Sequence, residues 1–258
     1  MTILGGVLID LSLFGMLAGL VSVLKPLRFF GIRTRWQGLL VMGLSLLAFA
    51  TGVDLPVSET RVGAPSTLLD EFVPAYQFSE FHSISIDAPK GKVSAAIWAV
   101  TPDEIRFYGA LTWIRRFGRP RPAGALNAPG SRPILGTFLK TGFLTLADDP
   151  GREIVFGFAR GPRGWAKSAA EFKALDQVQA PPLGKVAMNF RIQELDRTHC
   201  KLTTETRVYS AGTLALRVFA AYWRMIYPGS SLIRSEWLRA IKLRAEAAPD
   251  PGAPVPAD

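Results

Sequence analysis

Glu80 and His82 are the residues of this chain whose types and spacing best suit chemistry. A carboxylate beside an imidazole can work as a general acid and base. The two alternate within a run that has strand periodicity, so we expect them to share one face with Tyr76 and Phe78. The same spacing is ordinary for solvent-facing groups, and a histidine there can equally satisfy one backbone carbonyl. We therefore keep both residues as weak catalytic candidates and favour a protein without enzymatic activity.

Other reactive groups indicate no active site and no cofactor. His199 and Cys200 are neighbours, so on a strand their side chains point to opposite faces and cannot form a nucleophile and base pair. With two His and one Cys in the whole chain, we predict no metal. Glu205 and Arg207 share a strand face and are expected to form a salt-bridge set.

Two apolar runs stand at the start of the chain. Ile3 to Leu24 holds one acidic residue in 22 positions, and as a helix it would rise about 33 Å. Gln37 to Val53 carries no charge and would rise about 25 Å. Neither run has the polar stripe of a soluble core helix, and the first lacks the basic start and cleavage site of a signal peptide. We predict a two-helix transmembrane hairpin over residues 1–53.

Charge patterning predicts the orientation of this integral membrane protein. Lys25 to Arg35 contains four cations and no anion, whereas Asp54 to Glu71 contains four acidic residues against Arg61. Short basic loops stay in the cytoplasm, so we expect the residues after 53 to be extracytoplasmic. Asp10 lies near one end of its run, where it can reach the interface or a hydroxyl group of the neighbouring helix.

The rest of the chain divides into a linker at 54–74, a domain at 75–247 and a Pro-rich tail at 248–258 that we expect to be disordered. Within the domain, the periodicity predicts strand, two helices, two antiparallel hairpins and a long closing helix. The expected elements are a strand Tyr76–Ile86, helices Lys90–Val100 and Thr101–Phe117, strands Thr141–Ala147, Glu153–Arg160, Val186–Ile192 and Leu202–Val208, and a helix Thr213–Ala247 interrupted at Tyr227–Ser230.

This order resembles the helix-grip superfamily, also called START-like, Bet v 1-like or SRPBCC. The resemblance rests on the strand-to-helix junction Ile84-Ser-Ile-Asp-Ala-Pro-Lys-Gly-Lys-Val93 and on the closing helix. The blocks Lys201–Val208 and Tyr222–Arg234 look like an uncharacterised bacterial subgroup. The resemblance implies an α+β fold in which an antiparallel sheet wraps around the closing helix and leaves a cavity for a hydrophobic small molecule.

The expected inward face is apolar enough to line such a cavity. Alternatively, the same aromatic rings contact one another and fill the core. The candidate cavity residues are Tyr76, Phe78, Phe156, Phe158, Met188, Phe190 and Tyr222.

Three functions remain open. The first is binding of a lipid or other apolar ligand at the bilayer; the second is a cyclase- or hydratase-type enzyme that uses Glu80 and His82; the third is a structural or interaction protein with a filled core. The chain carries a net charge of +9, with basic residues at Arg115–Arg121 and along the closing helix at Arg224, Arg234, Arg239, Lys242 and Arg244. We interpret these as a solvated face, able to meet anionic lipid head groups, and predict no nucleic-acid partner.

Overall fold

The computed structural model describes residues 2–116, 118–120, 127–175 and 184–247, without the side chains of residues 2–4. The chain divides into two compact units. One comprises Met1–Glu59 and Ala211–Pro228, and the other comprises Thr60–Ser210 and Gly229–Asp258. The expected disordered tail, 248–258, lies outside the described residues.

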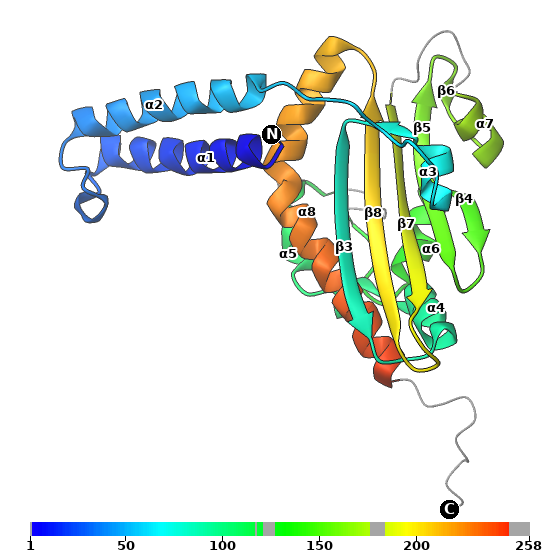
Figure 1. The fold of residues 1–258 in the computed structure, drawn as a ribbon. Coiled ribbons are helices and arrows are strands. Elements are labelled where there is room, and N and C mark those ends of the chain that lie inside the picture. Colours follow the sequence, from blue (N-terminus) through cyan, green and yellow to red (C-terminus); the bar gives the residue numbers. More distant parts are fainter. Residues whose placement is uncertain (1, 117, 121–126, 176–183, 248–258) are drawn as a thin grey trace, which may run out of the picture. The chain divides into compact units, whose positions relative to one another are not determined.

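The first unit is built on two apolar helices, α1 (Thr2–Leu24) and α2 (Arg35–Asp54), which run side by side as a hairpin (Figure 1). The loop between them holds a 3-10 helix, Arg28–Phe30, which ends at Gly31 with a φ of 77°. The Thr34 hydroxyl accepts from the Gln37 N–H, and the Gln37 side chain accepts from the Thr34 N–H, so a capping box starts α2.

Small residues hold this hairpin together. A Cβ added to Gly19 would lie 2.8 Å from the Gly38 carbonyl oxygen, and one added to Gly52 would lie 2.9 Å from the Ile9 side chain. Close approach through glycine is typical of helix pairs in membranes. The large side chains point outward instead, and only 22% and 17% of the two apolar windows are buried. The interpretation as buried helices of a soluble core does not fit this exposure.

The second unit contains an antiparallel sheet with the strand order β3-β8-β7-β5-β4 and a short β6 beside β5 (Figure 1). Strand β3 therefore forms one edge. A separate pair, β1 with β2, precedes it. The strands are β1 (Thr60–Arg61), β2 (Ala75–Tyr76), β3 (Phe78–Ile86), β4 (Leu144–Asp149), β5 (Glu153–Gly161), β6 (Gly164–Trp165), β7 (Gly184–Glu194) and β8 (Cys200–Ser210). The predicted α+β architecture, with an antiparallel sheet and a long C-terminal helix, is confirmed.

The remaining helices include short ones that the sequence patterns did not indicate, α3, α6 and α7. In the order of the chain, the elements are α3 (Leu68–Phe72), α4 (Lys90–Ala99), the 3-10 helix Pro102–Glu104, α5 (Tyr108–Arg115), α6 (Ile134–Lys140), α7 (Ala169–Ala174) and α8 (Thr213–Ala247). Helix α3 and strand β1 stand within the segment expected to be a plain linker.

Two expected helix boundaries are wrong. The capping box of Thr101 and Glu104 forms, but it starts one 3-10 turn; Phe107 then takes a φ of 61° and α5 begins at Tyr108. The expected break at Tyr227–Ser230 is also absent, because α8 continues through Pro228. Proline removes one helical hydrogen bond and crowds the carbonyl four residues earlier, which a long helix can tolerate.

Both faces of the sheet carry packed clusters, while the outward-facing side chains of the edge strand β3 are exposed. One face and α8 form a cluster that contains Ile86, Phe156, Phe190 and Trp237. The other face is covered by α3 and α7 and holds a second cluster, which includes Leu69, Phe72, Val155, Phe172 and Ala187. Adjacent residues of β5, Phe156 and Val155, thus belong to different clusters, as the alternation of a strand requires.

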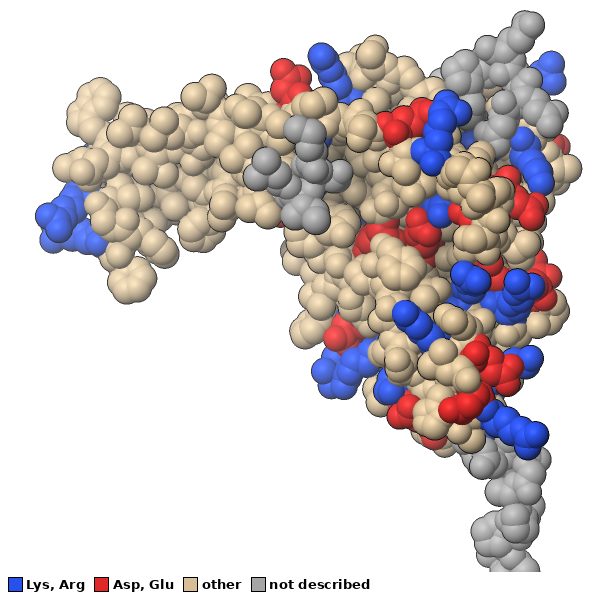
Figure 2. Space-filling view, in the orientation of Figure 1, with Lys and Arg blue, Asp and Glu red and all other residues tan. Residues whose placement is uncertain are grey.

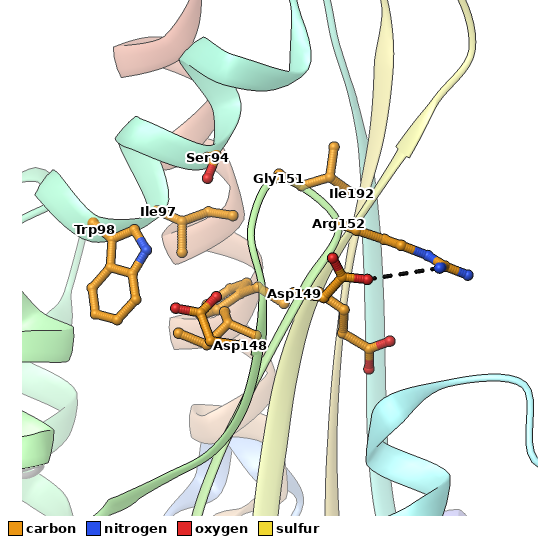
Figure 3. Close-up of a pocket in the computed structure, with 11 residues that line it drawn as sticks. Ser94, Ile97, Trp98, Asp148, Asp149, Gly151, Arg152 and Ile192 are labelled. Carbon is orange, nitrogen blue, oxygen red and sulfur yellow. Dashed lines mark ion pairs between the residues drawn. The ribbon is translucent and has the colours of Figure 1, made fainter.

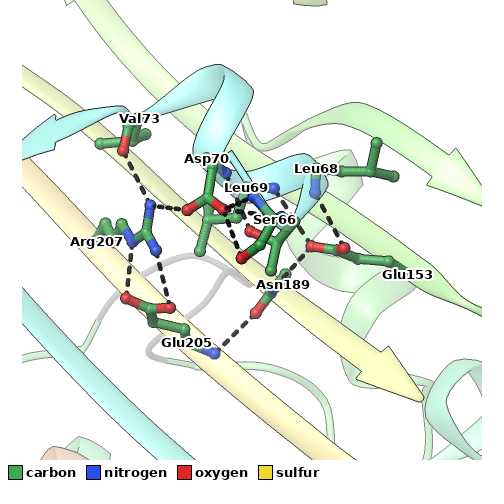
Figure 4. A network of polar contacts seen from close by, with 10 residues as sticks. Ser66, Leu68, Leu69, Asp70, Val73, Glu153, Asn189, Glu205 and Arg207 are labelled. Carbon is green, nitrogen blue, oxygen red and sulfur yellow. Dashed lines mark hydrogen bonds and ion pairs between the residues drawn. The ribbon is translucent and has the colours of Figure 1, made fainter. Parts of the chain in front are cut away.

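A polar network spans the α3 side of the sheet (Figure 4). Arg207 pairs with Asp70 at 2.7 Å and with Glu205 at 2.7 Å, so the expected salt bridge of Glu205 and Arg207 is confirmed. Glu153 accepts the N–H groups of Leu68 and Leu69, at 3.0 and 3.3 Å, and the Asn189 amide at 2.7 Å. These contacts fix α3 to β5, β7 and β8.

Acid should weaken this attachment through Asp70. Burial alone would raise the pKa of Asp70, but hydrogen bonds from the Ser66 and Thr67 backbone and from Arg207 outweigh it and lower the pKa to about 2. A lowered pKa stabilises the fold above pH 4, and that stability is lost as the pH falls toward 2. We expect Asp70→Asn to lower the unfolding free energy at pH 7 by roughly 2 kcal/mol, and to have little effect at pH 2.

Denaturant titrations of the full chain in detergent at several pH values measure this difference. Glu71→Gln is the matched control, since Glu71 is on the same helix and its exposed pair with Lys173 contributes little. An Asp70→Asn effect that stays constant from pH 7 to pH 2 would contradict the assignment.

Candidate functional site

The face of the sheet that packs against α8 carries a group of polar side chains, here called the inner polar cluster. On the two strands, Glu80 stands opposite Thr206 and His82 stands opposite Thr204. The cluster comprises Glu80 and His82 from β3, Thr204 and Thr206 from β8, and Ser230, Arg234 and Ser235 from α8.

Glu80 and His82, the two catalytic candidates, are brought together. Oε1 of Glu80 lies 2.9 Å from Nε2 of His82, and Oε2 accepts a hydrogen bond of 2.8 Å from the Ser230 hydroxyl. Glu80 is buried, whereas the His82 side chain keeps 17% of its surface exposed. The two residues therefore share a face, with the Glu80 carboxylate buried and the His82 imidazole partly exposed, within hydrogen-bond reach of each other.

Arg234 is the member of the cluster that the sequence analysis misplaced. It belongs to the expected solvated basic face, yet it is half-buried and its guanidinium turns toward the sheet, 5.5 Å from the centre of the Trp237 ring. It donates to the Thr206 hydroxyl, to the Met188 sulfur at 3.1 Å and to the Thr204 hydroxyl at 3.4 Å. Arg224, another member of the expected solvated face, is fully buried. Helical spacing carried a signal for Arg234, because Ile233, Trp237 and Ile241 line the same stretch of α8.

The charge of Arg234 has no direct counter-ion among the described residues, since none of their carboxylate oxygens lies within 4.0 Å of its nitrogens. Burial lowers the pKa of Arg234 to about 10, while the negative charge of Glu80 acts in the opposite direction. The guanidinium therefore stays protonated at neutral pH and faces neutral acceptors, which are weaker partners than a carboxylate or phosphate.

The inner polar cluster reaches solvent at the edge of the sheet. Strand β3 is an edge strand, and Ser235 is exposed, with its hydroxyl 3.3 Å from Nδ1 of His82. Glu80 and Arg234 lie behind this rim. The cluster thus joins exposed and half-buried polar groups at the edge to the buried carboxylate of Glu80.

Five of the seven expected cavity residues lie on the α8 side of the sheet: Phe78, Phe156, Phe158, Met188 and Phe190. Their rings pack on neighbours, with centroid distances of 6.1 Å for Phe156 and Phe190 and 5.1 Å for Phe190 and Trp237. The Trp237 indole N–H is buried and has no hydrogen-bond partner in the part of the chain that the structure describes. The aromatic residues thus form packed contacts beside the inner polar cluster.

The placement of Tyr76 on that face is wrong. Tyr76 ends β2 and packs with the α3-side cluster, where the Arg207 guanidinium lies 4.7 Å from its ring centre. The chain changes from β2 to β3 at Gln77, so the strand alternation does not continue across it. Tyr222 belongs to the first unit, where its ring lies 5.8 Å from that of Phe219.

Two hollows of the second unit differ from the expected apolar cavity. The one in Figure 3 lies between α4, which supplies Ser94, Ile97 and Trp98, and the β4–β5 turn; its volume of about 10 Å³ fits a single water. The other, of about 210 Å³, is lined by polar residues that include Ser66, Glu71 and Arg152. Neither touches Glu80, His82 or Arg234.

No metal cluster is present in the described part of the chain, where no three His, Cys, Asp or Glu side chains gather suitably. His199 bonds to Asp196 at 2.8 Å, and that contact raises the pKa of His199. Cys200 is buried, which raises the pKa of its thiol.

Comparison with known proteins gives little further information. No protein-family model matches the chain, and no curated protein matches it. The hypothetical protein jhp0584 from Helicobacter pylori is similar in structure, with a TM-score of 0.34 and 9% identity over 72% of this chain and 98% of that one. The Zhui aromatase/cyclase from Streptomyces sp. R1128 has a TM-score of 0.28 and 13% identity over 66% of this chain and 93% of that one.

Coupling between Glu80 and Arg234 can be measured directly. Glu80→Leu leaves the half-buried Arg234 charge without its nearby anion, which acts on it without direct pairing, so we expect the unfolding free energy to fall by roughly 1 to 3 kcal/mol. The double variant Glu80→Leu/Arg234→Met removes both charges and should recover most of that loss. Denaturant titrations of the full chain and of the two single variants and the double variant in detergent, monitored by tryptophan fluorescence, give the double-mutant cycle. Additive effects of the two substitutions would show that the charges do not interact.

Proposed function

We propose that this chain is a membrane-anchored helix-grip protein whose second unit binds a lipid or other apolar small molecule between the sheet and α8. The observation that carries the proposal is the placement of a buried carboxylate, Glu80, near a half-buried guanidinium, Arg234, beside packed aromatic rings. Buried charges seldom stabilise a fold relative to apolar side chains of the same size. The presence of Glu80 and Arg234 between the sheet and α8 therefore favours a role in ligand recognition.

The inner polar cluster would hold the polar end of the ligand. Arg234 offers a cation to an anionic or carbonyl oxygen, and the Trp237 indole N–H offers a second donor. The ligand would enter at the rim formed by His82 and Ser235, and its apolar part would take the place of ring contacts such as that of Phe190 with Trp237. Binding of this kind needs no covalent step.

The hairpin of α1 and α2 would be the membrane anchor. Its shaft is apolar and outward-facing, and Lys and Arg gather at its loop end (Figure 2). A basic loop in the cytoplasm would leave the second unit on the extracytoplasmic side.

Native mass spectrometry of the full chain in lipid nanodiscs, followed by solvent extraction, tests ligand binding. We expect the unsubstituted chain to release a discrete small amphiphile, and Arg234→Met to release much less, because the cationic partner of the polar end is gone. Arg239→Met is the matched control, since Arg239 is on the same helix and pairs with Glu236 nearer the surface.

Equal release from Arg234→Met and Arg239→Met would assign any bound molecule to the hairpin and its lipids. A chain that carries no small molecule after incubation with membrane extract would contradict ligand binding. The third function, an interaction protein with a filled core, would then gain support.

The second candidate function is an enzyme of the cyclase or hydratase kind. It is favoured by the 2.9 Å contact between His82 and Glu80, which is short enough for an acid and base pair. In that case His82→Ala should retain the extracted compound but lose its conversion, measured by mass spectrometry of compound incubated with each variant. A compound that stays unchanged with the unsubstituted chain indicates binding alone.

A further inference from the structure

The first part of α8, residues 213–228, belongs to the same compact unit as the hairpin. Its composition is unusual for a helix that closes a water-soluble domain. From Thr213 to Ile233 the only ionisable side chains with a charge at neutral pH are Arg217 and Arg224. The last turns of α8 differ, with Arg239, Lys242, Arg244 and Glu246 in close succession.

Arg224 joins this segment to the end of α2. Its Nη1 donates to the carbonyl oxygens of Gly52 and Val53, at 2.7 and 3.1 Å, and its Nη2 donates to that of Leu55 at 2.8 Å. The last carbonyls of a helix have no partner within the helix, and a cation is favourable there. The guanidinium therefore caps the C-terminal end of α2.

Glycine makes room for this contact on α1. A Cβ on Gly5 would lie 2.8 Å from Nε of Arg224, and one on Gly6 would lie 3.6 Å from the Arg224 carbonyl oxygen. Arg224 is buried, so its charge is not available to solvent or to another partner. The segment is thus packed against the ends of both hairpin helices.

The outer side of the same segment is apolar. Leu214 keeps 76% of its surface exposed and Val218 keeps 63%. Aromatic rings follow along the helix, with centroid distances of 6.0 Å for Phe219 and Trp223 and 6.2 Å for Trp223 and Tyr227. Tryptophan and tyrosine are enriched where a membrane protein meets the head groups, because their rings are apolar at one end and polar at the other.

We propose that residues 213–228 of α8 form a third membrane-associated helix, which lies in the bilayer interface with Leu214 and Val218 among the acyl chains. This proposal rests on the anchoring role of the hairpin. The lipid surface that covers the hairpin continues over the segment packed on its end, and Arg217 can extend its charge to the phosphate groups. Arg224 holds the segment in place.

Site-specific lipid quenching tests the proposal on the full chain. Leu214→Cys and Val218→Cys variants carry a thiol-linked fluorophore in vesicles of phosphatidylcholine and phosphatidylglycerol, with or without a nitroxide on the acyl chains. The natural Cys200 is buried, so the unsubstituted chain gives the labelling background. We expect both positions to lose fluorescence in the nitroxide vesicles, to an extent comparable with Leu17→Cys in the hairpin shaft.

Two further positions make the outcomes distinct. Leu243→Cys is the matched exposed leucine on α8 and should stay bright, because Lys242 and Arg244 flank it. Quenching at Leu17 with none at Leu214 and Val218 would overturn the interface helix and leave the anchor intact. No quenching at Leu17 would overturn the anchor and the inference together. Leu214 shielded from aqueous iodide but untouched by lipid nitroxide would identify a protein partner and also overturn the inference.

Arg224→Leu tests the attachment. We expect it to abolish quenching at Leu214 while that at Leu17 persists, because the segment loses its contact with the α2 carbonyls. Arg224→Lys, which keeps the cation, should retain part of the quenching. Unchanged quenching at Leu214 in Arg224→Leu would show that the guanidinium does not hold the segment.

Discussion

Strand β8 is the constraint on which the second unit depends. It pairs with β3 on one side and β7 on the other, over most of its eleven residues. Both faces of the sheet carry packed clusters, so successive side chains of β8 point alternately toward α8 and toward the α3 side, and the side chain of Lys201 near the end of the strand is exposed. Thr204 and Thr206 meet α8, while Glu205 and Arg207 meet α3. A shift of one residue in register would exchange these sets and bury the Glu205 and Arg207 charges against the aromatic cluster.

Arg207 of β8 and Arg234, which contacts β8 from the other face, show why the two faces of the sheet have different roles. Arg207 has two carboxylates, Asp70 and Glu205, each at 2.7 Å, and the carbonyl of Val73 at 3.2 Å. This is the compensation that a buried structural charge needs. Arg234 has hydroxyl and thioether partners, with Glu80 near enough to affect its pKa but beyond direct pairing. The first arrangement is complete, whereas the second can accept an anionic or carbonyl oxygen without losing an ion pair.

Strand alternation and apolar length carried most of the predictable information. Both β-hairpins and the faces of Met188 and Phe190 follow from local periodicity, because each side chain keeps its position along the strand. The two N-terminal helices follow from the length of their apolar runs. Helix α4 was predicted within one residue of its end. The sequence also indicated that Glu80 and His82 would share a face, because two residues of one strand need no information about distant contacts.

What could not be predicted depends on contacts between distant segments. Helix α3 has five residues and is held by Glu153 and Arg207, so its local sequence is too short to identify it. Tyr76 lies on the α3 side and not on the predicted α8 side, because the chain leaves the β1–β2 pair at Gln77 and then enters the main sheet. Arg234 looked like part of a charged surface, since a basic residue in a long helix is normally exposed. Its true environment required knowing that Thr204 and Thr206, about 30 residues earlier, stand opposite it.

Two arginines of α8 differ most from expectation. Both terminal nitrogens of Arg224 donate to carbonyl groups at the end of α2, while its Nε is buried without a partner among the described residues, so the side chain stabilises a junction and is closed to solvent. Arg234 lies behind a rim of His82 and Ser235, beside an indole N–H without a partner in the described part of the chain. An amphiphile with an acceptor oxygen would supply what both groups lack, and its apolar part would meet the rings next to them. Under the proposed function, the Arg234 guanidinium and the Trp237 indole N–H, more than the aromatic rings, would hold the polar end of the ligand.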